Sequence, residues 1–479
     1  MPRTRWLVLS IVALAAVLRL FWIGVGSLDI DEAFSVWVAR HPWRDIGAVL
    51  ARFDDHPALY YIVLHLWMRL AGDHEFALRL LSILCGVVTI PLAYWLGSVV
   101  GGRPLGLLTA FLMAVSPENV QWSQEARMYA LETLALVFAM CGLAWLLAHP
   151  DARAGSPGKH LALGAFVFGT ATALWTEYTA VLFPLAAAAV LAYVAWGKRG
   201  ERRRGIVRDW LPAYAAIGAL CFAELSLAFR QVHGANVINW FPVNPLALPS
   251  TLLVAAGLIA LGRVIWRSEP QWIAFTVGLW AVPILCLILV SLRHPIFTKQ
   301  TFVWTYVPLY LAVGAGLLHV RRRWAFALLL GAVMVVDIVG LVDHYRMDFL
   351  TSGVRGWDRA AEYVASRVRS DDVILFYVPY VQPAFDYYFE RAHRPVAEHG
   401  IPADFGSGRV LFPPLTDNDA PRVLEAVAGH PRAWFVHGMF PSARVILNAL
   451  DRSGHLLDSR VVTNALTVYQ YAINQRAHP

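Results

Sequence analysis

Charged residues are scarce in this sequence. They make up 15% of its 479 residues, whereas 58% are hydrophobic and the mean hydropathy is +0.52. A water-soluble chain of this length cannot bury so much apolar surface in its core. The shortage of charge therefore excludes an ordinary soluble protein and predicts a membrane protein.

Cysteine is also rare. The four cysteines all lie inside apolar runs, where a cysteine usually behaves as a small hydrophobic residue: Cys85, Cys141, Cys221 and Cys286. This pattern excludes a disulfide framework and a cysteine-based metal site. No glycine-rich phosphate loop is visible, so no nucleotide is expected. The net charge of +7 does not indicate a nucleic-acid partner, because the arginines cluster at the ends of apolar runs.

Apolar runs of about 20 residues are abundant, and each matches a hydrocarbon layer of roughly 30 Å. We predict eleven spans, at residues 6–26, 77–99, 105–120, 128–148, 160–176, 179–197, 210–228, 248–266, 271–292, 301–319 and 324–342. The first run is too long for a signal-peptide core and no small-residue cleavage site follows it, so we interpret it as a retained helix.

The arginines set the expected orientation. Arg103, a basic run within residues 198–208 and the triplet at residues 321–323 all fall on the side of the N-terminus, which the positive-inside rule makes cytoplasmic. The segment Pro57–Gly72 is also apolar, but a twelfth span there would move two of these clusters outside. We therefore expect it to be an interfacial amphipathic helix within a long outer loop at residues 28–76.

The composition changes after the last run. We divide the chain into a transmembrane module at residues 1–345 and an outer α/β domain at residues 346–479. Its clearest predicted elements are helices at Trp357–Val368 and Ala443–Leu450 and strands at Val373–Val378 and Ala433–His437. Four tyrosines of this domain either stack on sugar or, as we favour, form its core: Tyr377, Tyr380, Tyr387 and Tyr388.

Ionisable residues gather in the long outer loop. They are Asp29, Asp31, Glu32, Asp54, Asp55 and His56. Acids at a helix exit are often simply solvated. Carboxylates near a bilayer surface can also act as bases. A third alternative is a site for a divalent cation, Mg²⁺ or Mn²⁺, held by Asp31, Glu32, Asp55 and His56.

Other polar residues are expected on the same outer side. Glu125, Arg127 and Tyr129 lie at the mouth of the fourth span, and Glu177 and Tyr178 follow the fifth. Arg127 either pairs with Glu125 or faces a cavity, where an arginine suits a phosphate. Glu177 either occupies a short turn or lines that cavity.

The loop RHPIFTK adds cations to this side. It carries Arg293, His294 and Lys299, which oppose the positive-inside bias and therefore need a local reason. Phosphate binding is one reason, and a salt bridge to the outer acids is the other.

Together these motifs have a family likeness. The Asp31–Glu32 pair, DHPALYY (Asp55–Tyr61, with Tyr60), ALRLLS (Ala77–Ser82) and QEARMYAL (Gln124–Leu131) resemble the bacterial glycosyltransferases related to protein O-mannosyltransferases and lipid A aminoarabinose transferases. The resemblance implies the GT-C fold of glycosyltransferase family 39. It also implies a polyprenyl-phosphate sugar as donor and a lipid, glycan or protein as acceptor.

The resemblance assigns roles and shows departures. It makes Asp31 the catalytic base, with Glu32 in support. Ala58 stands where the family has the second proline of an HPP motif, Lys299 where it has a phosphate-binding arginine, and Glu177 with Tyr178 where it has His-Tyr. The hypothesis is inverting sugar transfer at the outer face of a bacterial plasma membrane.

Two other functions compete with this hypothesis. A lipid or sugar transporter is the main rival, although no internal repeat is seen and the runs contain few charges. An assembly protein that works through its outer domain would not need eleven spans as an anchor.

Overall fold

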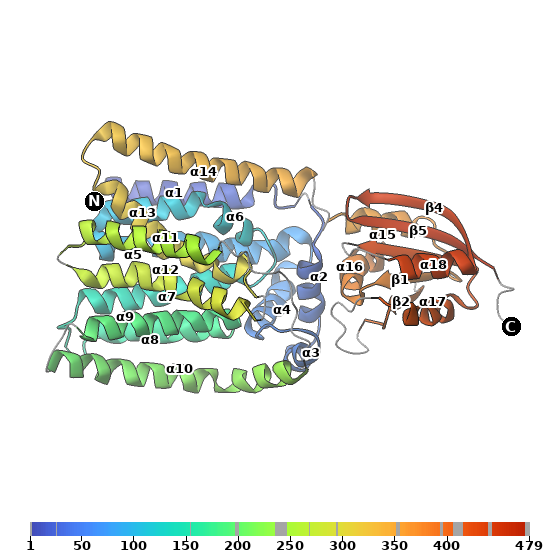
Figure 1. The fold of residues 1–479 in the computed structure, drawn as a ribbon, viewed down its shortest axis with the longest axis horizontal. Helices are drawn as coiled ribbons and strands as arrows, with labels where there is room; N and C mark the ends of the chain where they lie inside the picture. The colour runs from blue at the N-terminus through green and yellow to red at the C-terminus, as the bar shows by residue number, and fades with distance from the viewer. Residues whose placement is uncertain are drawn as a thin grey trace.

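The computed structural model describes residues 2–474, apart from 25, 154, 197–200, 235–246, 268, 294–295, 351–354, 393–395, 406–414 and 439–442. A long helical bundle is joined end to end to a smaller α/β domain, and the N-terminus lies at the end of the bundle farthest from that domain (Figure 1).

The bundle contains the predicted runs. Its helices are α1 (Pro2–Leu20), α5 (Glu75–Val115), α6 (Pro117–Ser123), α7 (Tyr129–Ala148), α8 (Pro157–Leu174), α9 (Leu182–Trp196), α10 (Glu201–Gly234), α11 (Ala247–Ile265), α12 (Pro270–Ser291), α13 (Tyr306–Leu318) and α14 (Arg323–Leu350), with 3-10 turns η1 (Tyr178–Val181) and η2 (Gln300–Thr305). All eleven predicted runs are helical, and the runs at 77–99 and 105–120 fall mainly in the two halves of α5.

A glycine pair divides α5 into a hairpin. Gly101 and Gly102 leave the helical conformation, and Gly102 has a φ of 81°, which favours glycine. The two halves then pack closely, since a Cβ added to Gly97 would lie 2.8 Å from the Cα of Gly106. This single long helix therefore contains two antiparallel passes.

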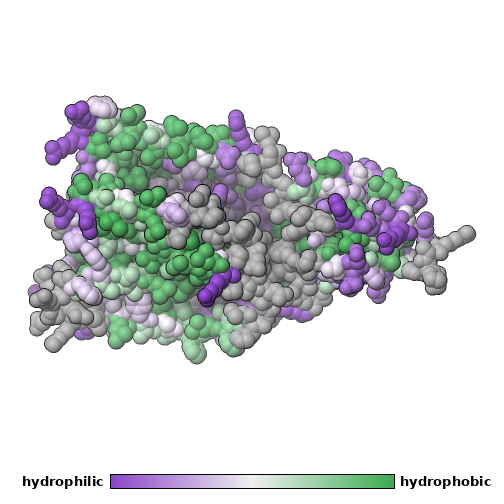
Figure 2. Space-filling model, viewed as in Figure 1, coloured by the Kyte–Doolittle hydropathy of each residue, from purple (hydrophilic) through white to green (hydrophobic). Residues whose placement is uncertain are grey.

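The bundle has the surface of a membrane protein. Apolar residues cover its visible side, whereas hydrophilic residues are more frequent on the α/β domain (Figure 2). Among the described residues, seven helical segments are long and apolar enough to cross a membrane, with α5 counted once. The chain is thus a multi-pass membrane protein, and the predicted number of eleven crossings is not established.

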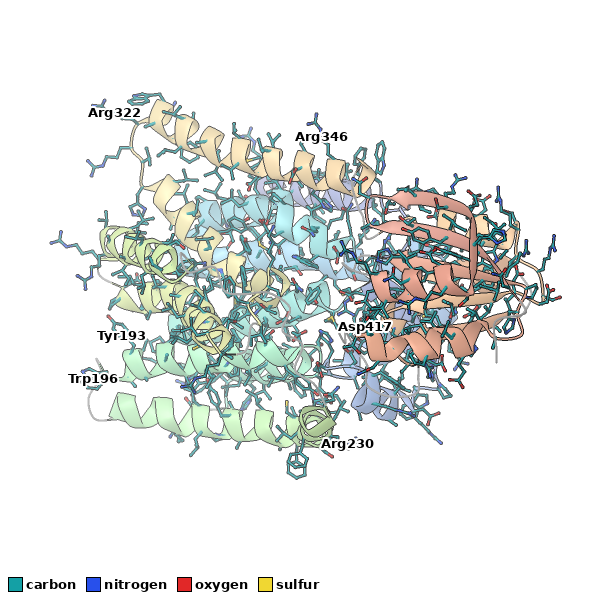
Figure 3. The ribbon with its side chains drawn as sticks, turned by 45° about the vertical axis from the view of Figure 1, so that its right-hand side comes forward. Tyr193, Trp196, Arg230, Arg322, Arg346 and Asp417 are labelled. Atoms are coloured by element: carbon teal, nitrogen blue, oxygen red, sulfur yellow. The ribbon has the colours of Figure 1, made fainter. Side chains whose placement is uncertain are left out.

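The two ends of the bundle differ. Arg322 of the basic triplet lies at the end opposite the α/β domain (Figure 3). At the other end, three helices of the long outer loop lie between bundle and domain: α2 (Ile30–Ala39), α3 (Ile46–Phe53) and α4 (Leu59–Ala71) (Figure 1). The helix α4, predicted to be interfacial, has 13 residues and is too short to cross a bilayer.

The C-terminal domain contains a mixed five-stranded sheet. Its elements are α15 (Trp357–Ala365), β1 (Val373–Tyr377), η3 (Pro379–Val381), α16 (Gln382–Ala392), β2 (Ala397–Ile401), η4 (Asp417–Asp419), α17 (Ala420–Val427), β3 (Arg432–Gly438), α18 (Arg444–Ser453), β4 (Gly454–Thr463) and β5 (Leu466–Ile473). The strand order is β2-β1-β3-β5-β4, with β1 parallel to both of its neighbours. All four predicted elements are present as α15, β1, β3 and α18.

Helix α14 runs on to Leu350, so the predicted boundary at 345 falls inside a helix. The C-terminal domain also shares its hydrophobic core with the outer loop. One cluster of buried apolar residues joins Phe34 and Val38 of α2 to Phe376 of β1 and Phe385 of α16. The outer loop and the C-terminal domain therefore pack as one layer over the end of the bundle.

Candidate functional site

The predicted site residues meet where α2 lies over the end of the bundle. Asp29 is the N-cap of α2: its carboxylate accepts the Glu32 N–H at 2.7 Å, and the Glu32 carboxylate accepts the Asp29 N–H at 3.1 Å. This reciprocal capping box fixes the start of the helix. Asp31 and Glu32 then point in different directions from the first turn.

Glu32 is locked in a buried ion pair. Arg79 of α5 donates from Nε to Glu32 Oε1 at 2.8 Å and from Nη2 to Oε2 at 2.7 Å, and the Ala126 N–H donates to Oε1 at 2.9 Å. Neither Glu32 nor Arg79 is more than 1% exposed. Burial raises the pKa of Glu32, but the charge and hydrogen bonds of Arg79 outweigh it and lower the pKa to about 2.

Arg79 also ties down the chain that precedes α2. It donates to the main-chain oxygens of Ile23, Gly26 and Ser27 at 2.7 to 3.0 Å. With all donors engaged inside the protein, Arg79 and Glu32 serve to hold α2, the first loop and the Ala126 segment together. The geometry thus gives Glu32 a structural role next to Asp31.

Asp31 itself keeps its carboxylate at the surface of this layer. It is half-buried, and its Oδ1 accepts a hydrogen bond from Tyr380 Oη at 3.1 Å. Its main-chain oxygen accepts from Ser35 Oγ at 2.9 Å and lies 3.4 Å from Arg127 Nη1. Asp31 and Arg127 are therefore neighbours in space, as the sequence hypothesis requires.

Arg127 is a buried cation that forms no ion pair in the described part of the chain. It is 3% exposed, it donates to Ser35 Oγ at 3.1 Å, and it lies 5.9 Å from the centre of the Tyr129 ring. Its Nε has no hydrogen-bond partner. The carboxylates of Asp31 and Asp54 interact with its charge electrostatically and offset part of the cost of burial. The unused Nε donor is suited to an anionic ligand.

A second charged cluster adjoins the first. His56 donates from Nδ1 to Asp54 Oδ1 at 2.9 Å, and its Nε2 lies 3.6 Å from Glu177 Oε2. Tyr61 donates to Asp54 Oδ2 at 2.6 Å. Burial lowers the pKa of His56, but the two acids outweigh it and raise the pKa to about 9, so His56 is an imidazolium at neutral pH.

Helix α10 holds this second cluster in place. Gln231 donates to the His56 carbonyl at 3.0 Å and accepts from Tyr178 Oη at 2.7 Å, and Glu224 accepts from the Ala58 N–H at 3.3 Å. Glu177 caps the short turn η1, where it accepts the Thr179 N–H at 3.3 Å, and it also lies beside His56, so both alternatives hold. Gln231 was missed in the sequence, because a single amide near a helix end has no distinctive spacing.

The remaining predicted residues are placed as follows. Tyr60 is fully buried, Tyr129 packs edge-on against Trp122 at 4.8 Å, and the Glu125 carbonyl accepts the Arg127 N–H at 2.8 Å. Asp55 is half-buried beside His56. No group of three or more His, Cys, Asp or Glu side chains among the described residues is arranged to hold a metal ion.

The predicted cations after α12 lie apart from this network. Arg293 and Lys299 are exposed, and His294 lies outside the described residues. Neither Arg293 nor Lys299 forms a hydrogen bond with Asp31 or Arg127. The structure therefore brings together Arg127 and the acids, and leaves the Arg293 and Lys299 side chains exposed.

Three of the four tyrosines that we favoured as domain core, Tyr377, Tyr380 and Tyr387, belong to the buried core that the domain shares with α2, and Tyr388 packs against it. The core interpretation is therefore confirmed. Three of the four also make polar contacts with the outer loop: Tyr380 donates to Asp31, Tyr387 donates to the Asp73 carbonyl at 2.6 Å, and Tyr388 accepts the Leu28 N–H at 2.8 Å.

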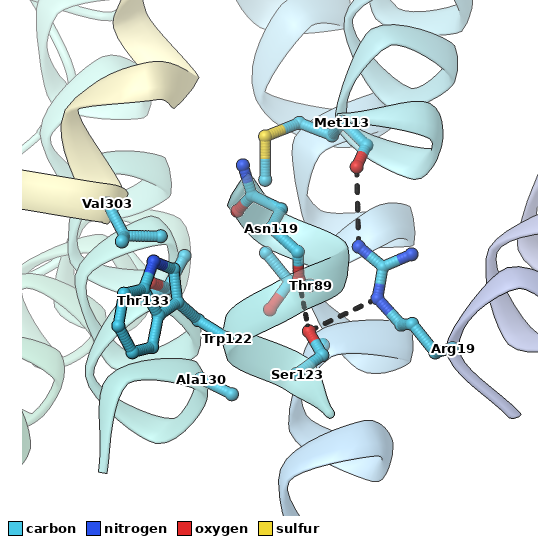
Figure 4. Close-up of a pocket in the computed structure, with 10 residues that line it drawn as sticks. Arg19, Thr89, Met113, Asn119, Trp122, Ser123, Ala130, Thr133 and Val303 are labelled. Carbon is cyan, nitrogen blue, oxygen red and sulfur yellow. Dashed lines mark hydrogen bonds between the residues drawn. The ribbon is translucent and has the colours of Figure 1, made fainter. Parts of the chain in front are cut away.

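Deeper in the bundle, a small cavity surrounds Arg19 (Figure 4). Arg19 donates to Ser123 Oγ at 3.2 Å and to the main-chain oxygens of Ala114 and Met113 at 3.1 and 3.3 Å. Carbonyl oxygens of neighbouring helices thus satisfy this intramembrane arginine. Asp31 does not line this cavity. The hydrogen bonds of Arg19 give it a structural role, because they join α1 to α5 and α6.

The locked ion pair makes a prediction about stability. Replacing Glu32 by Gln leaves the Arg79 charge buried and uncompensated, so we expect a loss of roughly 3–5 kcal/mol in the free energy of unfolding. The matched control is Asp31→Asn on the adjacent residue, whose carboxylate is half-buried. Thermal unfolding in detergent should show a large drop for the first variant and little change for the second; equal melting of both would contradict the assigned roles.

The His56 cluster makes a prediction about pH. Because the folded-state pKa of His56 is raised to about 9, its stabilisation is complete below its unfolded value of about 6.5 and is lost as the pH rises through 9. The His56 side chain is 24% exposed, so solvent screening limits the effect to the order of 1–2 kcal/mol.

His56→Asn should therefore flatten the decline of melting temperature between pH 6.5 and 9, whereas the exposed His160→Asn should retain it. If the melting temperature of His56→Asn declines with pH as steeply as that of the wild type, Asp54 and Glu177 do not keep the His56 ring protonated.

Comparison with known proteins supports the same reading of the fold. Residues 55–227, a little over a third of the chain, match the family model described as dolichyl-phosphate-mannose-protein mannosyltransferase. This segment includes Arg79, Arg127, His56 and Glu177, and it begins one residue after Asp54. Curated protein sequences give no match.

Solved structures resemble the chain over nearly its whole length. ArnT from Cupriavidus metallidurans, in a crystal structure bound to undecaprenyl phosphate, is 14% identical, with 98% of each chain covered and a TM-score of 0.67. The apo oligosaccharyltransferase of Archaeoglobus fulgidus is 10% identical, with 99% of this chain and 75% of that chain covered and a TM-score of 0.59. At such low identity these similarities show the fold. The chain therefore has the fold of ArnT and of the archaeal oligosaccharyltransferase, and its residues 55–227 match the mannosyltransferase family model.

Proposed function

We propose that the protein transfers a sugar from a polyprenyl-phosphate donor to an acceptor at the outer face of the membrane. The observation that carries this proposal is the closeness of Asp31, which is half-buried, to the buried guanidinium of Arg127, which donates to the Asp31 main-chain oxygen and whose Nε has no hydrogen-bond partner. An acid and an anion-binding cation side by side are what such a transfer needs.

The donor class follows from the cation and from the fold. Arg127 lies beneath the outer loop at the end of an apolar bundle, so a lipid phosphate bound there would leave its isoprenoid tail against the helices. The ArnT structure, which has the same fold, was solved with undecaprenyl phosphate. In our proposal the phosphate takes the unused Arg127 Nε donor, and Lys299 or Arg293 contributes a second charge once the donor is bound.

The chemical step is a single displacement. An acceptor hydroxyl or amine attacks the anomeric carbon, the bond from that carbon to the phosphate oxygen breaks, and the Asp31 carboxylate takes the acceptor's proton. Arg127 stabilises the charge that grows on the departing phosphate. Attack opposite the leaving group inverts the anomeric configuration.

The orientation also belongs to the proposal. The N-terminus and the Arg322 triplet lie at one end of the bundle, and Asp31 and the α/β domain lie at the other (Figure 3). The positive-inside rule then places the basic end in the cytoplasm and the site on the periplasmic or extracellular face of a bacterial plasma membrane.

The direct test is transfer of label from a panel of polyprenyl-phosphate sugars to membrane acceptors by purified protein in liposomes. Asp31→Asn should reduce the rate by about 100-fold or more, because a general base contributes 10²–10⁴-fold. Its melting temperature should stay near that of the wild type, which separates lost chemistry from lost folding.

Asp55→Asn is a suitable second variant, because Asp55 lies in the same outer loop and outside the proposed chemistry. Full activity in Asp31→Asn would remove it as the base. A wild-type protein that moves lipid-linked sugar across the bilayer without transferring it would instead favour the transporter.

A further inference from the structure

We infer that Tyr380 of the C-terminal domain is a positioning residue for Asp31, so that this domain completes the catalytic centre rather than only covering it. The inference rests on the proposed function, because it assigns a partner to the proposed base.

The contact is specific. Tyr380 donates from Oη to Asp31 Oδ1 at 3.1 Å, and this is the one hydrogen bond that reaches the Asp31 carboxylate from the described part of the chain. The Tyr380 side chain is 8% exposed, and its ring packs against Phe34 of α2 at 4.9 Å between centroids. Phe34 therefore fixes the ring, and the ring fixes where the hydroxyl points.

The sheet explains how the domain delivers this side chain. Tyr380 lies in η3, immediately after β1, whose neighbours β2 and β3 are both parallel to it. The chain therefore leaves the sheet at the carboxyl ends of three parallel strands, which is where α/β sheets commonly carry functional residues.

The backbone at this exit is strained. Val378, a β-branched residue, has a φ of 60°, a conformation that such residues rarely adopt. Conformations of this kind persist when the surrounding structure enforces them, and they cluster at functional sites. Here the strained turn redirects the chain from β1 toward α2 and places Tyr380 beside Asp31.

The rest of the interface holds the domain in this position. Arg40 at the end of α2 bonds to Glu390 of α16 at 3.1 Å and to Asp73 at 3.2 Å, and Arg391 bonds to Asp73 at 3.1 Å. Tyr387 and Tyr388 add the hydrogen bonds to Asp73 and Leu28 described above. Several independent contacts thus dock α16 on the outer loop, and Tyr380 alone among these tyrosines reaches the proposed base.

A hydroxyl that donates to one oxygen of a carboxylate holds the carboxylate plane, so that the other oxygen, Oδ2, is presented to the acceptor. This effect acts on the chemical step and leaves donor binding unchanged.

The test compares Tyr380→Phe with Tyr387→Phe in the liposome transfer assay. Both variants lose one hydroxyl from the same interface, but only the first loses a contact with Asp31. We expect kcat to fall about tenfold in Tyr380→Phe, the usual effect of losing a hydrogen bond to a charged group, with the donor KM unchanged. The pH–rate profiles of both variants are recorded beside that of the wild type.

Tyr387→Phe should keep the wild-type kcat and pH profile. If Tyr380→Phe behaves as the wild type while Asp31→Asn is inactive, the inference about Tyr380 is overturned and the proposed function stands. If both tyrosine variants lose activity equally and keep the wild-type pH profile, Tyr380 is only a docking contact. If the wild type transfers no sugar, the proposed function fails and this inference fails with it.

Discussion

The buried pair of Glu32 and Arg79 is the interaction on which the rest of the site depends. It joins the first turn of α2, the start of α5, the loop before α2 and the Ala126 segment through one guanidinium and one carboxylate. Desolvating two charges is expensive, and excellent geometry with every hydrogen bond made is the condition under which such a pair is tolerated. Once it forms, the direction of the neighbouring Asp31 and the approach of Arg127 are both fixed.

This arrangement divides the charges of the outer layer by role. Glu32 is neutralised inside the protein, and His56 is held as a cation between Asp54 and Glu177. Arg127 is different, because it is buried, forms no ion pair among the described residues and keeps its Nε without a hydrogen bond. This unused donor is the reason that we propose an anionic group of the substrate as its partner. The shared core of α2 and the C-terminal domain then encloses this cation on the outer side.

Much of this could be predicted from the sequence, because hydrophobic run length and the resemblance of four motifs are strong signals. The helical runs, the C-terminal α/β domain and the proximity of Asp31 to Arg127 were all expected. The ion pair between Glu32 and Arg79 was not expected, since Arg79 lies in ALRLLS, a segment that by itself indicates only part of an apolar helix. The contact between Tyr380 and Asp31 could not be predicted either, because 349 positions separate the two residues and nothing local marks the contact. The strand β4 was missed because its residues are mostly exposed and give no apolar run.

The central claim is that Arg127 receives the donor phosphate beside Asp31. The most direct test is an experimental structure of the protein in lipid nanodiscs with undecaprenyl phosphate. We expect a phosphate oxygen within about 3 Å of Arg127 Nε, on the side of the guanidinium that faces Asp31. A phosphate held by Arg293 or Lys299 alone, with Arg127 Nε still unoccupied, would contradict the account.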